Sequence, residues 1–91
     1  MAKKTVKICN KSHQVGTPVT AAKRLSCHIR NPEGSYRIYP VDEGTVGHIK
    51  SIASNREGHI EWKYFTVLFP DSGAEFVLSE WMADTYFNTT A

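Results

Sequence analysis

The sequence predicts a small all-β domain, a single barrel of five or six strands with one short C-terminal helical turn. The chain has 91 residues, which fit one domain but are too few for two separate cores. Its apolar content of 41% is enough for one packed core. Short segments rich in β-branched and aromatic residues recur between turn signals, which is typical of an all-β fold.

We divide the single domain, residues 1–91, into three parts. Residues 1–16 hold a basic N-terminal strand and a loop, residues 17–84 form the barrel, and residues 85–91 form a tail that frays from Asn88.

The N-terminal strand is expected at Thr5–Cys9, at an edge of the fold. Val6 and Ile8 alternate there with Lys7 in the period-two pattern of a half-buried strand. Asn10–Gly16 is polar and predicts a loop.

The early barrel is weakly patterned. Val19 follows Pro18 in an extended setting, although Thr20–Leu25 also allows a helical turn. Ser26–Gly34 predicts a long loop, with a turn at its end where proline and glycine occur in Asn-Pro-Glu-Gly. The strand at Tyr36–Val41 contains a proline, which a central strand tolerates poorly.

The later barrel carries the clearest pattern. Gly47 interrupts a β-branched stretch and predicts a bulge or sharp bend, and Asn55–Gly58 predicts a turn. Ile60–Phe69 is the strongest strand and has apolar residues on both faces, so it is expected to be central. One face has Phe65, Val67 and Phe69, and the other has Trp62, Tyr64 and Leu68.

A hairpin turn is predicted at Pro70–Gly73, after which Ala74–Leu78 returns as a strand. Ser79 can cap a helical turn at Glu80–Asp84, whose Trp81 is expected to close one end of the barrel.

These residues carry a family resemblance. The order Val41-x-x-Gly44-Thr45-Val46-x-x-Ile49, a turn, a Tyr64–Phe69 strand ending in Pro-Asp-Ser-Gly, and Phe76-x-Leu78 resembles SH3-like barrels. The closest similarity is to the group with KOW-type domains and the small accessory subunit of photosystem I. It covers Val41 to Met82 and implies a fold, because such barrels serve protein docking, nucleic-acid binding and subunit stabilisation alike.

Charge is divided unevenly along the chain. Residues 1–37 carry eight basic side chains and one acidic one, a net charge of +7, and residues 38–91 carry three basic and eight acidic ones, a net charge of −5. The basic half is either an arm for an acidic partner or a surface that attracts the acidic half within the fold.

The sequence predicts a cytoplasmic protein. No run of about 20 apolar residues could span a bilayer, and the N-terminus lacks the apolar stretch of a secretory signal. Two cysteines are too few for a disulfide scaffold.

Neither a metal site nor an active site is expected, and no cofactor. Cys9, His13, Cys27 and His28 have poor spacing for zinc, because adjacent Cys27 and His28 on a strand would point to opposite faces. No phosphate-binding glycine loop, Gly-x-Ser-x-Gly or His-Glu-x-x-His motif occurs.

The leading functional prediction is a non-enzymatic protein-binding, adaptor or subunit-stabilising module. Its contact surface would comprise the predicted loop between Ser26 and Tyr39 together with Trp62–Tyr64. The alternative is a KOW-like nucleic-acid-binding domain that uses the basic half. The candidate binding residues are Lys23, Arg24, Arg30, Arg37, Tyr36, Tyr39, Trp62 and Tyr64.

Overall fold

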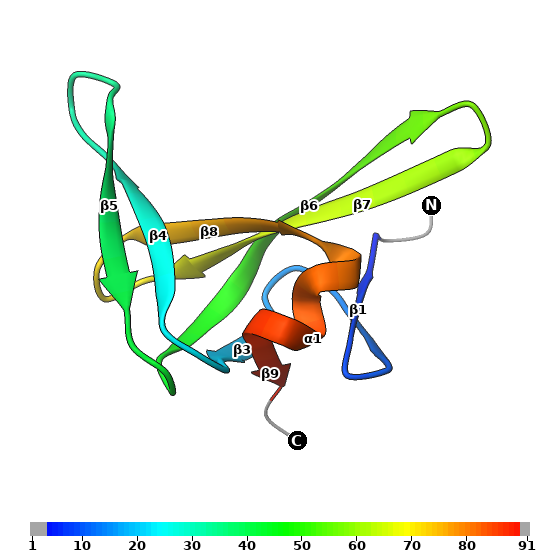
Figure 1. Ribbon diagram of the computed structural model, residues 1–91, viewed down its shortest axis with the longest axis horizontal. Helices are drawn as coiled ribbons and strands as arrows, with labels where there is room; N and C mark the ends of the chain where they lie inside the picture. The colour runs from blue at the N-terminus through cyan, green and yellow to red at the C-terminus, as the bar shows by residue number, and fades with distance from the viewer. Residues whose placement is uncertain (1–3, 90–91) are drawn as a thin grey trace.

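The computed structural model describes residues 4–89, which form nine β-strands and a short helical segment near the C-terminus. Seven strands make one antiparallel sheet in the order β5-β4-β8-β7-β6-β3-β9, which curls into a half-barrel (Figure 1). The all-β prediction with a short C-terminal helical turn is confirmed, and the main sheet has seven strands where five or six were expected.

The elements follow one another in a simple order. They are β1 (Val6–Ile8), β2 (Lys11–His13), β3 (Pro18–Ala21), β4 (Leu25–Arg30), β5 (Tyr36–Val41), β6 (Val46–Glu57), β7 (Ile60–Phe69), β8 (Ala74–Ser79), a 3-10 helix (Glu80–Met82), α1 (Ala83–Tyr86) and β9 (Phe87–Thr89). Within the described residues, no helix has the length and apolar character needed to cross a membrane.

Strand β7 has the bounds that the sequence predicts and lies between β6 and β8 in the middle of the sheet. Its inward side chains Phe65, Val67 and Phe69 are buried. The turn to β8 is also as predicted, with Gly73 at a φ of +76° and its N–H donating to the Phe69 carbonyl at 2.8 Å.

The β6–β7 hairpin is longer than expected. Asn55–Glu57, predicted as part of a turn, belongs to β6, and the turn itself is only Gly58 and His59. β7 pairs with β8 from Tyr64 onward. The part of the hairpin before Tyr64 contains only β6 and β7, so it is a two-stranded arm (Figure 1).

The predicted bulge at Gly47 is wrong in position, because the register of β6 against β7 shifts between Ile49 and Ser51. Gly47 has a different role. A Cβ atom built on it would lie 2.6 Å from the Leu68 carbonyl oxygen and 2.9 Å from Cδ1 of Phe69. The glycine therefore permits close approach of two backbones.

The predicted long loop at Ser26–Gly34 is also wrong. Most of it is β4, where Leu25 and Cys27 are buried and the alternate residues Ser26, His28 and Arg30 are exposed. Only the turn is as predicted, with the Asn31 N–H donating to the Ser35 carbonyl at 2.7 Å and Gly34 at a φ of +98°. The proline of β5 lies in an edge strand, as expected.

The N-terminal segment forms a hairpin apart from the main sheet. The expected strand is confirmed as β1, but the polar stretch predicted as a loop contains β2. The turn consists of Cys9 and Asn10, both at positive φ, as a two-residue hairpin turn requires. Val6 and Ile8 are fully buried against the barrel.

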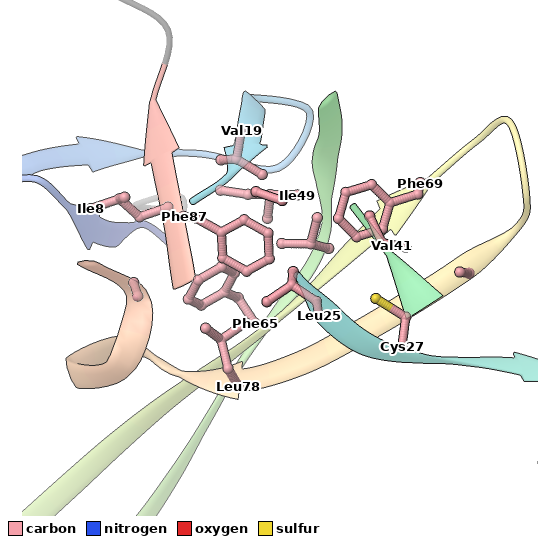
Figure 2. Packing of buried hydrophobic residues seen from close by; sticks show 14 of the residues in the cluster. Ile8, Val19, Leu25, Cys27, Val41, Ile49, Phe65, Phe69, Leu78 and Phe87 are labelled. Atoms are coloured by element: carbon pink, nitrogen blue, oxygen red, sulfur yellow. The ribbon is translucent and has the colours of Figure 1, made fainter. Parts of the chain in front are cut away.

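The C-terminal segment is part of the core. Phe87, expected to lie in a tail, is fully buried, and β9 pairs with β3 from Phe87 to Thr89. Its ring lies among core side chains in Figure 2, at 6.4 Å from the Phe65 ring. Trp81 does not close the barrel, since it is 77% exposed.

Candidate functional site

An open hollow of about 480 Å³ lies on the outer face of the sheet. The alternation of side chains along each strand produces this face. On β4, for example, Leu25 and Cys27 point into the core, and His28 and Arg30 point outward. The hollow is lined by His28, Arg30, Tyr36, Lys50, Glu75 and Val77, from strands β4, β5, β6 and β8.

Contacts inside the hollow are exposed and individually weak. Lys50 Nζ donates to Glu75 Oε1 at 3.1 Å, and these side chains are 50% and 37% exposed. Such a pair contributes at most about 1 kcal/mol to stability. The rings of His28 and Tyr36 meet edge to face, with centroids 6.3 Å apart. The hollow thus offers an aromatic edge and mixed charge to a ligand.

Large apolar side chains surround the hollow at one edge of the sheet. Tyr36 and Ile38 of β5 are 64% and 71% exposed, and Val77 of β8 is 63% exposed. Ile38 lies directly opposite His28. Because scattered single apolar residues are normal on a surface, it is their gathering on neighbouring strands that marks this face as a candidate site.

Of the predicted binding residues, the structure brings Arg30 and Tyr36 together. They form a cross-strand pair of β4 and β5, and both line the hollow. Arg37 and Tyr39 also lie on β5 but alternate to its other face, where Tyr39 lines a second, smaller hollow of about 170 Å³.

The other predicted binding residues lie elsewhere. Lys23 and Arg24 are exposed in the segment between β3 and β4, with Lys23 Nζ 5.0 Å from the centre of the Tyr86 ring. Trp62 is a half-buried residue of the β6–β7 arm, and Tyr64 stands at the base of that arm.

Sequence reasoning missed four residues of this face: Ile38, Lys50, Glu75 and Val77. The exposure of Ile38 could have been predicted, because Ile38 shares a face with Tyr36 and the proline in this strand indicates an edge strand. No comparable signal exists in the sequence for Lys50. The bulge in β6 is at Lys50, between Ile49 and Ser51, whereas the sequence predicts it at Gly47.

The cysteines and histidines considered for zinc are dispersed. Cys27 is buried in the core while the adjacent His28 is exposed on the outer face, the arrangement that strand alternation predicts. Cys9 is exposed in the N-terminal turn. His13, expected at the surface, is half-buried, and its Nε2 atom is buried without a partner. Within residues 4–89 no three metal-binding side chains come together.

The two thiols should differ sharply in reactivity. Burial raises the pKa of the Cys27 thiol from 9.0 to about 11, so it stays protonated and inaccessible at neutral pH. We expect native protein to react with one equivalent of a thiol reagent, at Cys9, and unfolded protein with two. Since the unfolded chain loses the Cys27 proton first, stability should fall as pH rises from 9 to 11. Two fast thiols in the native protein would contradict the packing of β4.

No family model, curated protein or solved structure matches this chain, so its resemblance to SH3-like barrels stays a prediction.

Proposed function

We propose that this chain is a non-enzymatic protein-binding module, an adaptor or subunit-stabilising domain, that docks through the outer face of β4, β5 and β8. The observation that carries the proposal is the exposure of Tyr36, Ile38 and Val77 around one hollow. Tyrosine and arginine are enriched among the residues that dominate binding energy at protein interfaces, and Arg30 lies opposite Tyr36.

Charge supports an acidic protein as the partner. Residues 23–41 carry Lys23, Arg24, Arg30 and Arg37 against the single acid Glu33, a net charge of +3. Within the described chain none of these four basic side chains forms an ion pair, since the one present joins Lys50 to Glu75. Arg30 lies in the hollow and Arg37 on the other face of the same edge strand, so these two charges can steer a negatively charged surface toward β5.

The proposal includes an SH3-like architecture and a reducing, cytoplasmic setting. Both cysteines are free thiols, one in an exposed turn and one in the core, and neither supports the fold as a disulfide.

Nucleic-acid binding is the second candidate, and the hollow offers one observation in its favour: Arg30 and Lys50 line it together with the Tyr36 side chain. Three features weaken it. Glu75 occupies the same hollow and is bonded to Lys50, Arg37 lies on the other face of β5, and Lys23 is directed to the Tyr86 ring.

Replacing Tyr36 and Ile38 together by serine should weaken partner binding by about thirtyfold or more. Both positions then lose the apolar area by which a hot-spot residue contributes to binding. Truncating a hot-spot residue costs at least about 2 kcal/mol of binding free energy, which corresponds to about thirtyfold in affinity. The partner is recovered with tagged protein from native extract, identified, purified and titrated by calorimetry. Both substituted side chains are exposed, so the melting temperature should hardly change.

Trp81→Ser is the matched control, because Trp81 is the most exposed large apolar residue among residues 4–89 and lies outside the hollow. Its affinity should equal that of the unsubstituted protein, and nuclease treatment should leave recovery unchanged. Recovery that nuclease abolishes, with affinity for nucleic acid falling with salt at a slope of about −0.7 to −0.9 per phosphate, would show that the second candidate is correct.

A further inference from the structure

We infer that β5 accepts an extended, acidic segment of the partner as an additional strand of the sheet. This inference rests on the proposed function and specifies how the docking occurs. Strand addition uses backbone hydrogen bonds for affinity and alternate side chains for specificity, and it requires an unpaired strand edge.

The register of the β4–β5 hairpin shows which backbone groups of β5 are unpaired. The Asn31 N–H donates to the Ser35 carbonyl, so this pair is hydrogen-bonded across the hairpin. Bonded and non-bonded pairs alternate along antiparallel strands. Arg37 and Tyr39 therefore bond to β4, and the N–H and C=O groups of Tyr36 and Ile38 point to the free edge.

Pro40 fits this assignment. Its backbone nitrogen points away from β4, so the absence of an N–H group removes no hydrogen bond between β4 and β5. β5 is the outermost strand of the sheet in Figure 1. Its residues are exposed from Tyr36 through Pro40, and no hydrogen bond found among residues 4–89 reaches its outer side.

Most other strand edges among residues 4–89 are short or covered, and the exception is the β6–β7 arm, where β6 after Ile49 and β7 before Tyr64 have no further strand beside them. The free part of β6 there has mostly small or polar side chains, and that of β7 is four residues long, Ile60–Lys63. β9, at the opposite end of the sheet, has three residues, as do β1 and β2. The outer edge of β1 is covered by carboxylates, because the Lys7 N–H donates to Glu80 Oε2 at 2.9 Å and the Cys9 N–H to Asp84 Oδ1 at 2.6 Å. Proteins commonly protect exposed edges in these ways. β5 is six residues long and has neither protection along Tyr36–Arg37–Ile38.

The two faces of β5 define the chemistry of the added strand. One face presents Tyr36 and Ile38, and the other presents Arg37 and Tyr39. An added strand would place alternate residues beside the apolar pair and the rest beside Arg37. Opposite charges on facing strands are favourable, so the fitting segment alternates β-branched and acidic residues.

A second copy of this chain fits the edge less well. Antiparallel pairing of two β5 strands centred on Arg37 would place two arginines directly opposite each other, which is unfavourable. Pairing centred on Ile38 would align Tyr36 with Pro40, which has no N–H to donate.

The test is amide hydrogen exchange of the full chain with a capped eight-residue peptide of alternating valine and glutamate. A peptide of alternating valine and lysine is the matched control. The glutamate peptide should slow exchange at the amides of Tyr36 and Ile38 by about tenfold or more, which corresponds to about 1.4 kcal/mol. The lysine peptide should slow it much less, because Arg37 repels it.

Two variants separate backbone from side-chain effects. Ile38→Pro removes the N–H at the free edge and should abolish binding of the glutamate peptide. Ile38→Thr keeps the N–H and a β-branched side chain, and should retain most of it. If Ile38→Pro proves to be unfolded, the exchange of the unsubstituted protein still decides.

Three results would overturn the inference. The first is slower amide exchange with the glutamate peptide at residues outside β5. The second is an equal slowing of exchange by both peptides. The third is amide exchange that slows as protein concentration rises without peptide, which would make a second copy the occupant. If the purified partner depends on Tyr36 and Ile38 while their amides exchange freely in its complex, the proposed function stands and strand addition fails. If no partner depends on those side chains, the proposed function itself fails.

Discussion

Replacing Phe87 by alanine should lower the free energy of unfolding by about 3–5 kcal/mol, the range for truncating a fully buried phenylalanine. Phe87 is 0% exposed, and its ring lies 5.9 Å from that of Phe76 and 6.4 Å from that of Phe69. Figure 2 shows it among the labelled core side chains, so the cavity left by its truncation would be enclosed by buried residues. A small domain is stable by about 5–15 kcal/mol, so this variant should be close to unfolding at 37 °C.

Trp81→Ala is the control for this prediction. Trp81 is larger than Phe87 and lies six residues before it, but it is 77% exposed, so its truncation should change stability by less than about 0.5 kcal/mol. Urea unfolding followed by circular dichroism measures both variants. A loss for Trp81→Ala as large as that for Phe87→Ala would contradict the placement of β9 in the core.

The parts of the fold that the sequence predicts well are specified locally. β7 has large apolar residues on both faces over ten positions, and the turn after it has a proline and a glycine at positions that a tight hairpin requires. Such signals depend on neighbours in the chain, so no knowledge of the rest of the sheet is needed to interpret them.

The parts that were mispredicted depend on distant partners. β4 has apolar residues at alternate positions, but its polar outer residues and the nearby turn favoured a loop. It is a strand because it pairs with β5 on one side and contacts β8 on the other. β9 is shorter still, and Phe87 becomes a core residue only because β9 pairs with β3, which places Phe87 opposite Ala21.

The candidate site is predicted only in part for the same reason. Arg30 and Tyr36 meet across one short turn, so their proximity follows from the hairpin alone. Glu75 reaches the same hollow through the pairing of β8 with His28, and Lys50 reaches it through a bulge in β6. Neither the pairing of β8 with β4 nor the position of the bulge can be predicted from a single segment of the sequence.

The proposed docking edge lies away from the core, which makes binding and stability separable. β5 buries only Val41, next to Leu25, and its remaining residues extend beyond the packed interior. Substitutions at Tyr36 and Ile38 should therefore alter binding at nearly constant stability, whereas those at Phe87 should alter stability first.

Gly47→Val should destabilise the protein by about 3 kcal/mol or more, at or above the upper end of the usual cost of overpacking. The β carbon alone would lie 2.6 Å from the backbone oxygen of Leu68, and the added methyl groups increase the crowding against the Phe69 ring. The oxygen belongs to the central strand β7, so it can yield only if β6 separates from β7 at this point.

The sign of the stability change for Gly47→Val distinguishes the close contact from strand preference. Gly47 does not have a positive φ, so nothing in its own backbone conformation demands glycine. Valine has a much higher strand preference than glycine, and without the contact Gly47→Val should stabilise β6 by up to about 1 kcal/mol. Gly58→Asn is the control, because nothing lies within 4 Å of a Cβ at Gly58 and asparagine tolerates its φ of +60°. That variant should lose less than about 1 kcal/mol, because asparagine bears the left-handed conformation better than other non-glycine residues. Thermal and urea unfolding of both variants measure the difference, and a gain in stability for Gly47→Val would show that β6 and β7 do not approach as closely as the structure places them.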